Sequence, residues 1–216
     1  MHVKVCPVRY KNVNCVLSDS KSFLHMESVY HQDKQYVKIN FQSQDNRGAV
    51  YDGCIFDGCV FYQVDLSDCN FINCTFTHCD LCLADVSRTG FQDVRFSHCK
   101  LMGISFASCS TFGLSFSFEH CLLQHSVFAK LKLKMQQFNS CKLQEVDFTG
   151  TDLTGALFAE CDLERAVFWQ SNLEKADLQN SFNYQIDPEH NRIKRAKFSI
   201  WGLQGLLYKY EIVVMK

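Results

Sequence analysis

Large apolar side chains recur at every fifth residue through most of the chain, and this period limits what it can fold into. The grid has 25 positions, running from Phe56 to Phe116 and, after a slip of two residues, from Leu123 to Leu178. Only Thr111 on this grid is polar. A period of five matches neither the 3.6-residue repeat of a helix nor the two-residue alternation of a flat strand. It indicates a chain that turns a corner after each five-residue unit.

A smaller inward residue precedes each grid position by two, and an Asp or Asn often stands between them. Examples are Val64-Asp65-Leu66, Thr151-Asp152-Leu153 and Cys161-Asp162-Leu163. The remaining residues of each unit are mostly polar. Each unit is therefore expected to contribute one large and one small side chain to a core, and to expose the rest.

Residues twenty apart are alike in kind, which predicts four units in each coil. Once the slip between 116 and 123 is allowed for, six phenylalanines form one expected ladder in the core: Phe56, Phe76, Phe96, Phe116, Phe138 and Phe158. The next face reads Phe61, Leu81, Leu101, Leu123, Leu143 and Leu163, and its small partners are all cysteines. Units with no higher order would not sort into faces in this way.

In many units a small residue is followed by Asp or Asn, then by Leu or Phe, and then by two variable residues. This order resembles that of the pentapeptide-repeat family. The match covers about 36–198. The resemblance implies an all-β fold, a right-handed quadrilateral parallel β-helix with four pentapeptides per coil.

The thirteen cysteines are expected to belong to the core. Their odd number and the lack of a recognisable secretory signal favour reduced thiols in a cytoplasmic protein. Ten fall in the small inward slot, where a thiol acts as a compact hydrophobe. The pair Cys79 and Cys82 has metal-ligand spacing, but Cys79 is predicted to point inward and Cys82 outward. No second pair follows at zinc spacing, so no metal and no cofactor is expected.

The repeat divides the chain into three parts. Residues 1–35 carry no regular period, 36–198 form the β-helix, and 199–216 form a C-terminal cap. An interruption near 117–120 is interpreted as a corner insertion that forms a bulge. Within the cap, a short helix is expected over 201–210 and a strand over 211–215.

The cap carries more apolar surface than a lid over the open end of a β-helix requires. This surplus predicts a homodimer with twofold symmetry. The expected interface comprises Trp201, Leu203, Leu206, Leu207, Tyr208, Tyr210, Ile212, Val213 and Val214. Similar tails close dimers in the quinolone-resistance branch of the family, which this arrangement resembles most.

Charge is distributed unevenly although the net charge is only −1. Residues 41–181 carry 17 acidic and 10 basic side chains, whereas 1–40 and 182–216 each carry six basic and three acidic ones. An acidic shaft with basic ends is predicted. The balance of charge excludes a polybasic nucleic-acid binder. No run of eighteen apolar residues exists to cross a membrane. Direct binding to a nucleic acid or to a membrane is therefore not expected.

Three features oppose close mimicry of DNA by this shaft. Six aspartates in the corner slot can bond turn amides rather than present charge: Asp65, Asp80, Asp147, Asp152, Asp162 and Asp177. Lys130, Lys132 and Lys134 interrupt the acidic shaft, and the outward loops are short.

No motif for a catalytic nucleophile, a phosphate loop, a dinucleotide site or a zinc protease occurs, and a filled β-helix offers no catalytic cavity. A non-enzymatic protein is therefore expected. His78, His98 and His120 can stack on one face, and solvated surface histidines are favoured over a metal ladder.

Members of the quinolone-resistance branch bind bacterial type II topoisomerases, chiefly DNA gyrase, and shield them from fluoroquinolones. The resemblance thus implies a bacterial DNA mimic with DNA gyrase or topoisomerase IV as its partner. The alternative function is a rigid interaction scaffold with a different partner. The residues that would contact the partner are not indicated by the sequence.

Overall fold

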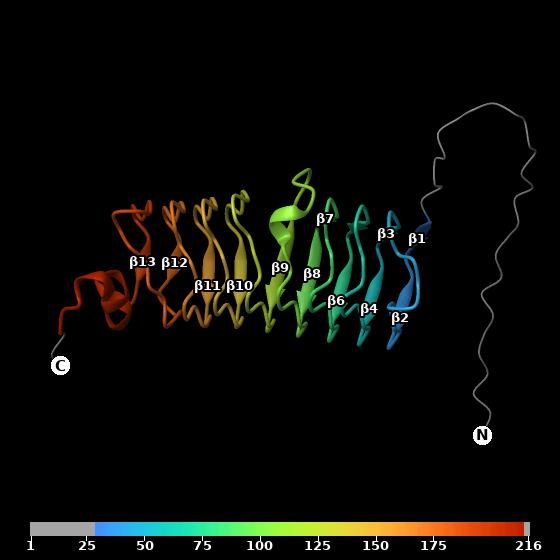
Figure 1. Ribbon diagram of the computed structural model, residues 1–216, viewed down its shortest axis with the longest axis horizontal. Helices are drawn as coiled ribbons and strands as arrows, with labels where there is room; N and C mark the ends of the chain where they lie inside the picture. The colour runs from blue at the N-terminus through green and yellow to red at the C-terminus, as the bar shows by residue number, and fades with distance from the viewer. Residues whose placement is uncertain (1–28, 214–216) are drawn as a thin grey trace, which may run out of the picture.

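Residues 29–213, which the computed structural model describes, form a rod of stacked coils (Figure 1). All strand pairs are parallel. One sheet of nine strands runs the length of the rod in the order β2-β4-β6-β8-β9-β10-β11-β12-β13, and a second sheet has the order β1-β3-β5-β7. The all-β, parallel β-helix predicted from the sequence is confirmed.

The strands are only two to four residues long. They are β1 (Tyr30–Gln32), β2 (Gln35–Val37), β3 (Val50–Asp52), β4 (Ile55–Asp57), β5 (Asn70–Ile72), β6 (Thr75–Thr77), β7 (Gly90–Gln92), β8 (Val94–Ser97), β9 (Phe116–Glu119), β10 (Gln137–Asn139), β11 (Leu157–Ala159), β12 (Asp177–Leu178) and β13 (Lys197–Phe198). Residues 29–213 also contain three 3-10 helices: η1 (Phe106–Ser108), η2 (Ile200–Leu206) and η3 (Tyr208–Tyr210).

The five-residue period arises from a repeated backbone conformation at the corners. Successive corner residues such as Asn73, His78 and Leu83 have φ between 53° and 58°. This left-handed conformation ends each short strand and turns the chain onto the next face. The backbone groups are satisfied between coils: the Lys38 N–H donates to the Asp57 carbonyl at 2.8 Å, and the Val60 N–H donates to the Ile39 carbonyl at 2.9 Å.

The twenty-residue coil follows from strand register. Phe56 pairs with Phe76, and Phe76 pairs with Phe96. The rings of Phe56 and Phe76 stack with centroids 4.5 Å apart and planes 10° from parallel. Rings from adjacent faces meet edge to face instead, as for Phe71 and Phe76 at 5.3 Å and 70°. Both arrangements are favourable for aromatic pairs, so the core is filled with stacked columns that interlock across the coil.

The phenylalanine ladder passes through Phe118, and its predicted member Phe116 lies in a neighbouring column. Phe96 pairs with Phe118, and their rings stack at 5.4 Å and 11°. Phe118 stacks on Phe138 in turn, at 5.6 Å and 4°. Phe116 pairs with Val94, in the slot that smaller residues fill in the preceding coils. The predicted ladder was therefore wrong at this one step, although Phe116 is buried like the other five.

The two extra residues lie in a loop over 110–115, earlier than the predicted interruption at 117–120. Thr111, Phe112 and Gly113 are exposed there, so the grid position at Thr111 contributes no large side chain to the core. Phe116 occupies the resulting space. Its ring centroid lies 5.4 Å from that of Phe106 and 6.2 Å from that of Phe128. The loop is the projection above the rod between β7 and β9 in Figure 1.

The regular structure begins before the predicted boundary at residue 36. β1 pairs with β3, and the His31 ring stacks on Tyr51 at 4.7 Å, continuing an aromatic column with a histidine that the apolar grid did not include. At the other end, β13 closes the long sheet at Phe198.

All eleven cysteines between Cys54 and Cys161 are buried as free thiols. The thiols of Cys59, Cys79 and Cys99 each donate to a carbonyl of the preceding coil at 3.3–3.4 Å. Cys82, predicted to face outward into solvent, is only 6% exposed. It stands between Tyr62 and Met102, the residues at the same position of the flanking coils.

Replacement of Phe96 by Ala should destabilise the rod by about 3–5 kcal/mol, because a rigid stack cannot close around the cavity left by a ring. Phe112→Ala is the matched control: this phenylalanine is 82% exposed, so its loss should change stability by less than about 0.5 kcal/mol. Urea unfolding followed by circular dichroism measures both. Equal effects of the two variants would contradict the stacked core.

The buried thiols should be nearly unreactive in the folded protein. Burial raises the pKa of Cys69 and of Cys74 to about 12, and only the thiolate attacks a disulfide reagent. In a Cys6→Ser/Cys15→Ser variant at about pH 8, a chromogenic disulfide should label the thiols slowly until denaturant is added.

The same shifts predict a pH dependence of stability. The unfolded thiols ionise first as the pH rises, so the free energy of unfolding should fall between about pH 9 and pH 12. In the labelling experiment above, labelling of the native thiols as fast as that of the thiols in the unfolded chain would contradict their buried placement.

Candidate interaction surfaces

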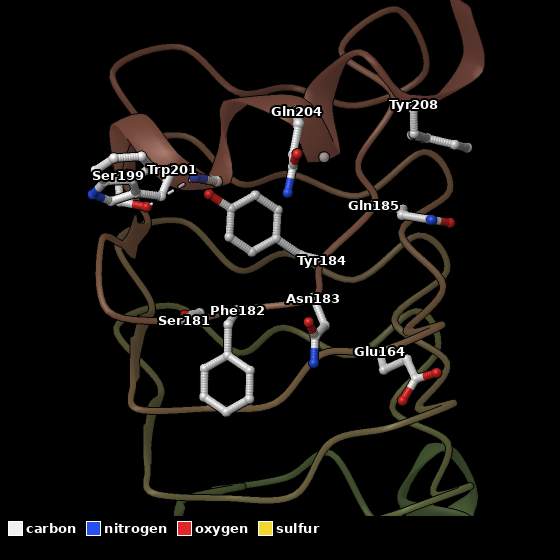
Figure 2. A pocket seen from close by; sticks show the side chains of 12 residues that line it. Glu164, Ser181, Phe182, Asn183, Tyr184, Gln185, Ser199, Trp201, Gln204 and Tyr208 are labelled. Carbon is white, nitrogen blue, oxygen red and sulfur yellow. Dashed lines mark hydrogen bonds between the residues drawn. The ribbon is translucent and has the colours of Figure 1, made fainter. Parts of the chain in front are cut away.

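A groove of about 750 Å³ lies between the last coil and η2 (Figure 2). Phe182, Trp201 and Tyr208 give it aromatic walls, and Asn183, Gln185, Gln204 and Glu164 add polar groups. It brings together no nucleophile and base within hydrogen-bond reach of each other.

Tyr184 fixes the position of η2 over this groove. A Cβ atom at Gly202 would overlap the Tyr184 hydroxyl, and one at Gly205 would overlap the Tyr184 carbonyl. Glycine is therefore required at both positions for the cap to approach this closely. The Ile186 N–H donates to the Gly205 carbonyl at 3.0 Å, which ties the cap to the last coil.

A second anchor holds η3. The Lys209 ammonium lies 2.8 Å from the Asp187 carboxylate and 2.7 Å from that of Glu189. The hydrogen bonds from Lys209 hold the pKa of both carboxyl groups below their usual range. The Tyr210 hydroxyl also donates to Glu189 at 3.0 Å, so the cap has a defined orientation.

Most residues of the predicted dimer interface are exposed on this cap. Those exposed are Trp201, Leu203, Leu207, Tyr208, Tyr210, Ile212 and Val213. Leu206 is partly buried against the core, and Val214 lies outside the described residues. The expected helix over 201–210 is two short 3-10 helices, and residues 211–213 form no strand. The rest of the predicted strand lies outside the described residues.

The aspartates of the corner slot bond the turn backbone, as the sequence suggested. Each accepts the backbone N–H two residues later: this holds for Asp65, Asp80, Asp147, Asp152, Asp162 and Asp177. Such bonds stabilise the turn and fix one carboxylate oxygen. The charge is retained, because a carboxylate accepts these bonds in its ionised form.

Asp45, Asp65 and Asp85 form an exposed row on one face, one residue per coil. Asp65 and Asp85 are bridge partners, which places them about 4.8 Å apart along the rod. Arg47 is the basic residue beside the row: it bonds Asp45 at 2.9 Å and lies 3.9 Å from Asp65. We call these three aspartates the acidic row.

His78, His98 and His120 stack at one corner as predicted. Their ring centroids are separated by 5.2 Å and 4.7 Å. Asp57 lies 3.5 Å from His78, and the Ser97 hydroxyl lies 2.9 Å from His98. In the part of the chain that the structure describes, no three His, Cys, Asp or Glu side chains stand close enough to hold a metal ion.

None of the helices over residues 29–213 has the length and the apolar character needed to cross a membrane.

Comparison with family models identifies the repeat. A model of the pentapeptide repeat region matches residues 51–117, and a model of eight pentapeptide repeats matches 138–180. The two matches together cover about half of the chain. The protein belongs to the pentapeptide repeat family. No curated protein matches the sequence.

A solved structure shows the same fold. A trypsin-treated variant of QnrB1, a plasmid-mediated fluoroquinolone resistance protein, aligns with a TM-score of 0.65 at 19% identity, covering 88% of this chain and all of that one. HetL, involved in heterocyst differentiation regulation in the cyanobacterium Nostoc sp. strain PCC 7120, aligns with a TM-score of 0.48 at 13% identity, over 80% of this chain and 87% of that one. The likeness to QnrB1 shows a common fold.

Sequence reasoning missed the loop over 110–115 and its exposed Phe112. The signal was present in Thr111, the one polar grid residue, because a polar side chain at a core position marks a unit that leaves the core. The slip was instead placed after the next phenylalanine, since Phe116 and Phe118 both fit a five-residue grid.

Proposed function

We propose that this protein is a non-enzymatic, cytoplasmic binding protein that docks on a bacterial type II topoisomerase, DNA gyrase in the first instance, by mimicking DNA. Protection from quinolones would follow where the rod occupies the DNA-binding surface of the enzyme. The acidic row is the observation that carries the proposal.

The acidic row has properties that a basic DNA channel can recognise. The carboxylates of Asp45 and Asp65 are 58% and 52% exposed, so their charge faces solvent. Bonds to the turn backbone hold Asp65 and Asp85 in place before a partner arrives. Preorganised charges at regular spacing lose little entropy on binding and attract a cationic surface over a distance.

A homodimer through the cap would double the length of this surface. The exposed aromatic and aliphatic residues of η2 and η3 lie at one end of the rod, where a twofold axis would join two copies. The anchors at Tyr184 and Lys209 keep this apolar end rigid. The fold shared with QnrB1 is compatible with the same proposal.

A rigid scaffold for a different partner is the second candidate function, and the C-terminal half of the rod favours it. Asp152, Asp162 and Asp177 are each within 4 Å of a lysine ammonium. Their charge is therefore partly compensated, as that of Asp45 and Asp65 is by Arg47, whereas Asp85 in the acidic row has no cation within 4.0 Å among the described residues. A rod that mimicked DNA along its whole length would not pair these carboxylates internally.

A supercoiling assay with purified DNA gyrase, with and without ciprofloxacin, separates the two candidates. Topoisomerase binding predicts rescue of supercoiling at low protein or inhibition at higher protein. The triple variant Asp45→Asn, Asp65→Asn, Asp85→Asn should weaken either effect by about tenfold, since it removes charge and keeps the side-chain acceptor for the turn.

The matched control is Asp52→Asn, Asp93→Asn, Glu119→Gln, which removes three charges outside the row. No effect of the wild-type protein at large molar excess would reject topoisomerase binding and leave the scaffold. Equal losses in both triple variants would reject the acidic row as the contact.

The dimer has a separate test. Trp201, 80% exposed, is replaced by Asp, which adds a charge to the proposed apolar interface without entering the core. Light scattering after size exclusion should give twice the chain mass of 24.9 kDa for the wild-type protein and the monomer mass for Trp201→Asp. Phe112→Asp, in the remote loop, should remain dimeric. A monomeric wild-type protein would contradict the interface.

A further inference from the structure

One face of the C-terminal half of the rod is basic. Lys132, Asp152, Asn172 and Arg192 form a single column, because each is the bridge partner of the next across successive coils. The same face and its bounding corners carry further exposed cations. We call this surface the basic face and define it by its unpaired cations: Lys130, Lys132, Lys175, Lys194 and Arg195.

The basic face retains an excess of positive charge after its own ion pairs are counted. Its two carboxylates are already engaged, Asp152 by Lys134 at 3.5 Å and Glu174 by Arg192 at 2.7 Å. Within residues 29–213, none of the five defining cations has a carboxylate within 4.0 Å. Lys175, Lys194 and Arg195 also line one small hollow with Glu174, which gathers three of them at one place.

A notch that includes Leu114 and Met135 in its lining adjoins the lysines. It has a volume of about 230 Å³ and lies between the end of the loop at Leu114 and the coil segment 132–137. Lys132, Lys134 and Met135 line it. Met135 is 72% exposed, and Phe112 in the same loop is 82% exposed. Large apolar side chains this exposed beside uncompensated cations are characteristic of an interaction surface.

We propose that the basic face and its notch bind an acidic protein segment that carries an apolar side chain. The carboxylates of the segment would face the five unpaired cations, and its apolar side chain would enter the notch beside Met135. A protein partner is favoured over a nucleic acid because Met135, a 72% exposed apolar side chain, lies in the notch beside Lys132, where a phosphate backbone offers no apolar group. This assignment does not depend on topoisomerase binding, which uses the acidic row.

The test is fluorescence anisotropy with a labelled peptide of repeated Glu-Glu-Leu units, with a peptide of Glu alone and with a DNA duplex, at about 50 mM salt. The Glu-Glu-Leu peptide should bind the wild-type protein, and Lys132→Glu, Arg195→Glu should weaken its binding by at least about tenfold. The matched control is Lys38→Glu, Arg95→Glu, which makes the same change in net charge on other faces and should weaken binding by less than about twofold.

The notch is tested in the same assay with Met135→Ala, which should weaken binding of the Glu-Glu-Leu peptide and leave binding of the Glu peptide unchanged. Thermal melts confirm that the exposed substitutions leave the fold intact. Absence of peptide binding, equal losses in the two charge-reversal variants, or tighter binding of the DNA duplex than of the peptide would each overturn the proposal.

Discussion

Stacking of identical corners is the constraint on which the whole structure depends. A coil can rest on the one before it only if backbone amides meet carbonyls at all four corners and inward rings lie over inward rings. The parallel register of Phe56, Phe76 and Phe96 meets both conditions at once. Because every coil must satisfy them, the large inward residue, the small inward residue and the left-handed corner recur with little freedom, whereas outward residues are free to vary.

That division explains how much the sequence could predict. The period of five and its grouping by twenty are sufficient for the coil, the faces and the buried cysteines, since these depend on local pattern alone. The five-residue pattern was not sufficient to predict the path of the chain over 110–118. Phe116 and Phe118 are both large and apolar, and only the packing of Phe116 beside Phe106 and Phe128 decides which of them joins the ladder. The sequence pattern also did not predict that Cys82 is only 6% exposed.

A filled core leaves the outer surface as the place where function can reside. The numbers of charged residues in each segment predicted an acidic shaft with basic ends. The register between coils shows that the charges are sorted further, onto separate faces. The acidic row lies on one face toward the N-terminal end of the rod. The basic face, whose column of bridge partners runs from Lys132 to Arg192, lies in the C-terminal half. Charges far apart in the chain are gathered by the twenty-residue repeat, so a face can specify a partner although its residues form no sequence motif.

The central claim is that one continuous rod runs past the loop, although the family models match it as two blocks, 51–117 and 138–180. Hydrogen exchange of backbone amides tests this most directly. A single rod predicts that the inter-coil amides on both sides of the loop, such as those of Arg95 and Leu123, exchange together at the rate of global unfolding, while Phe112 and Gly113 exchange fast. Two blocks that exchange independently, with loss of protection of the amides that pair β8 with β9, would contradict it.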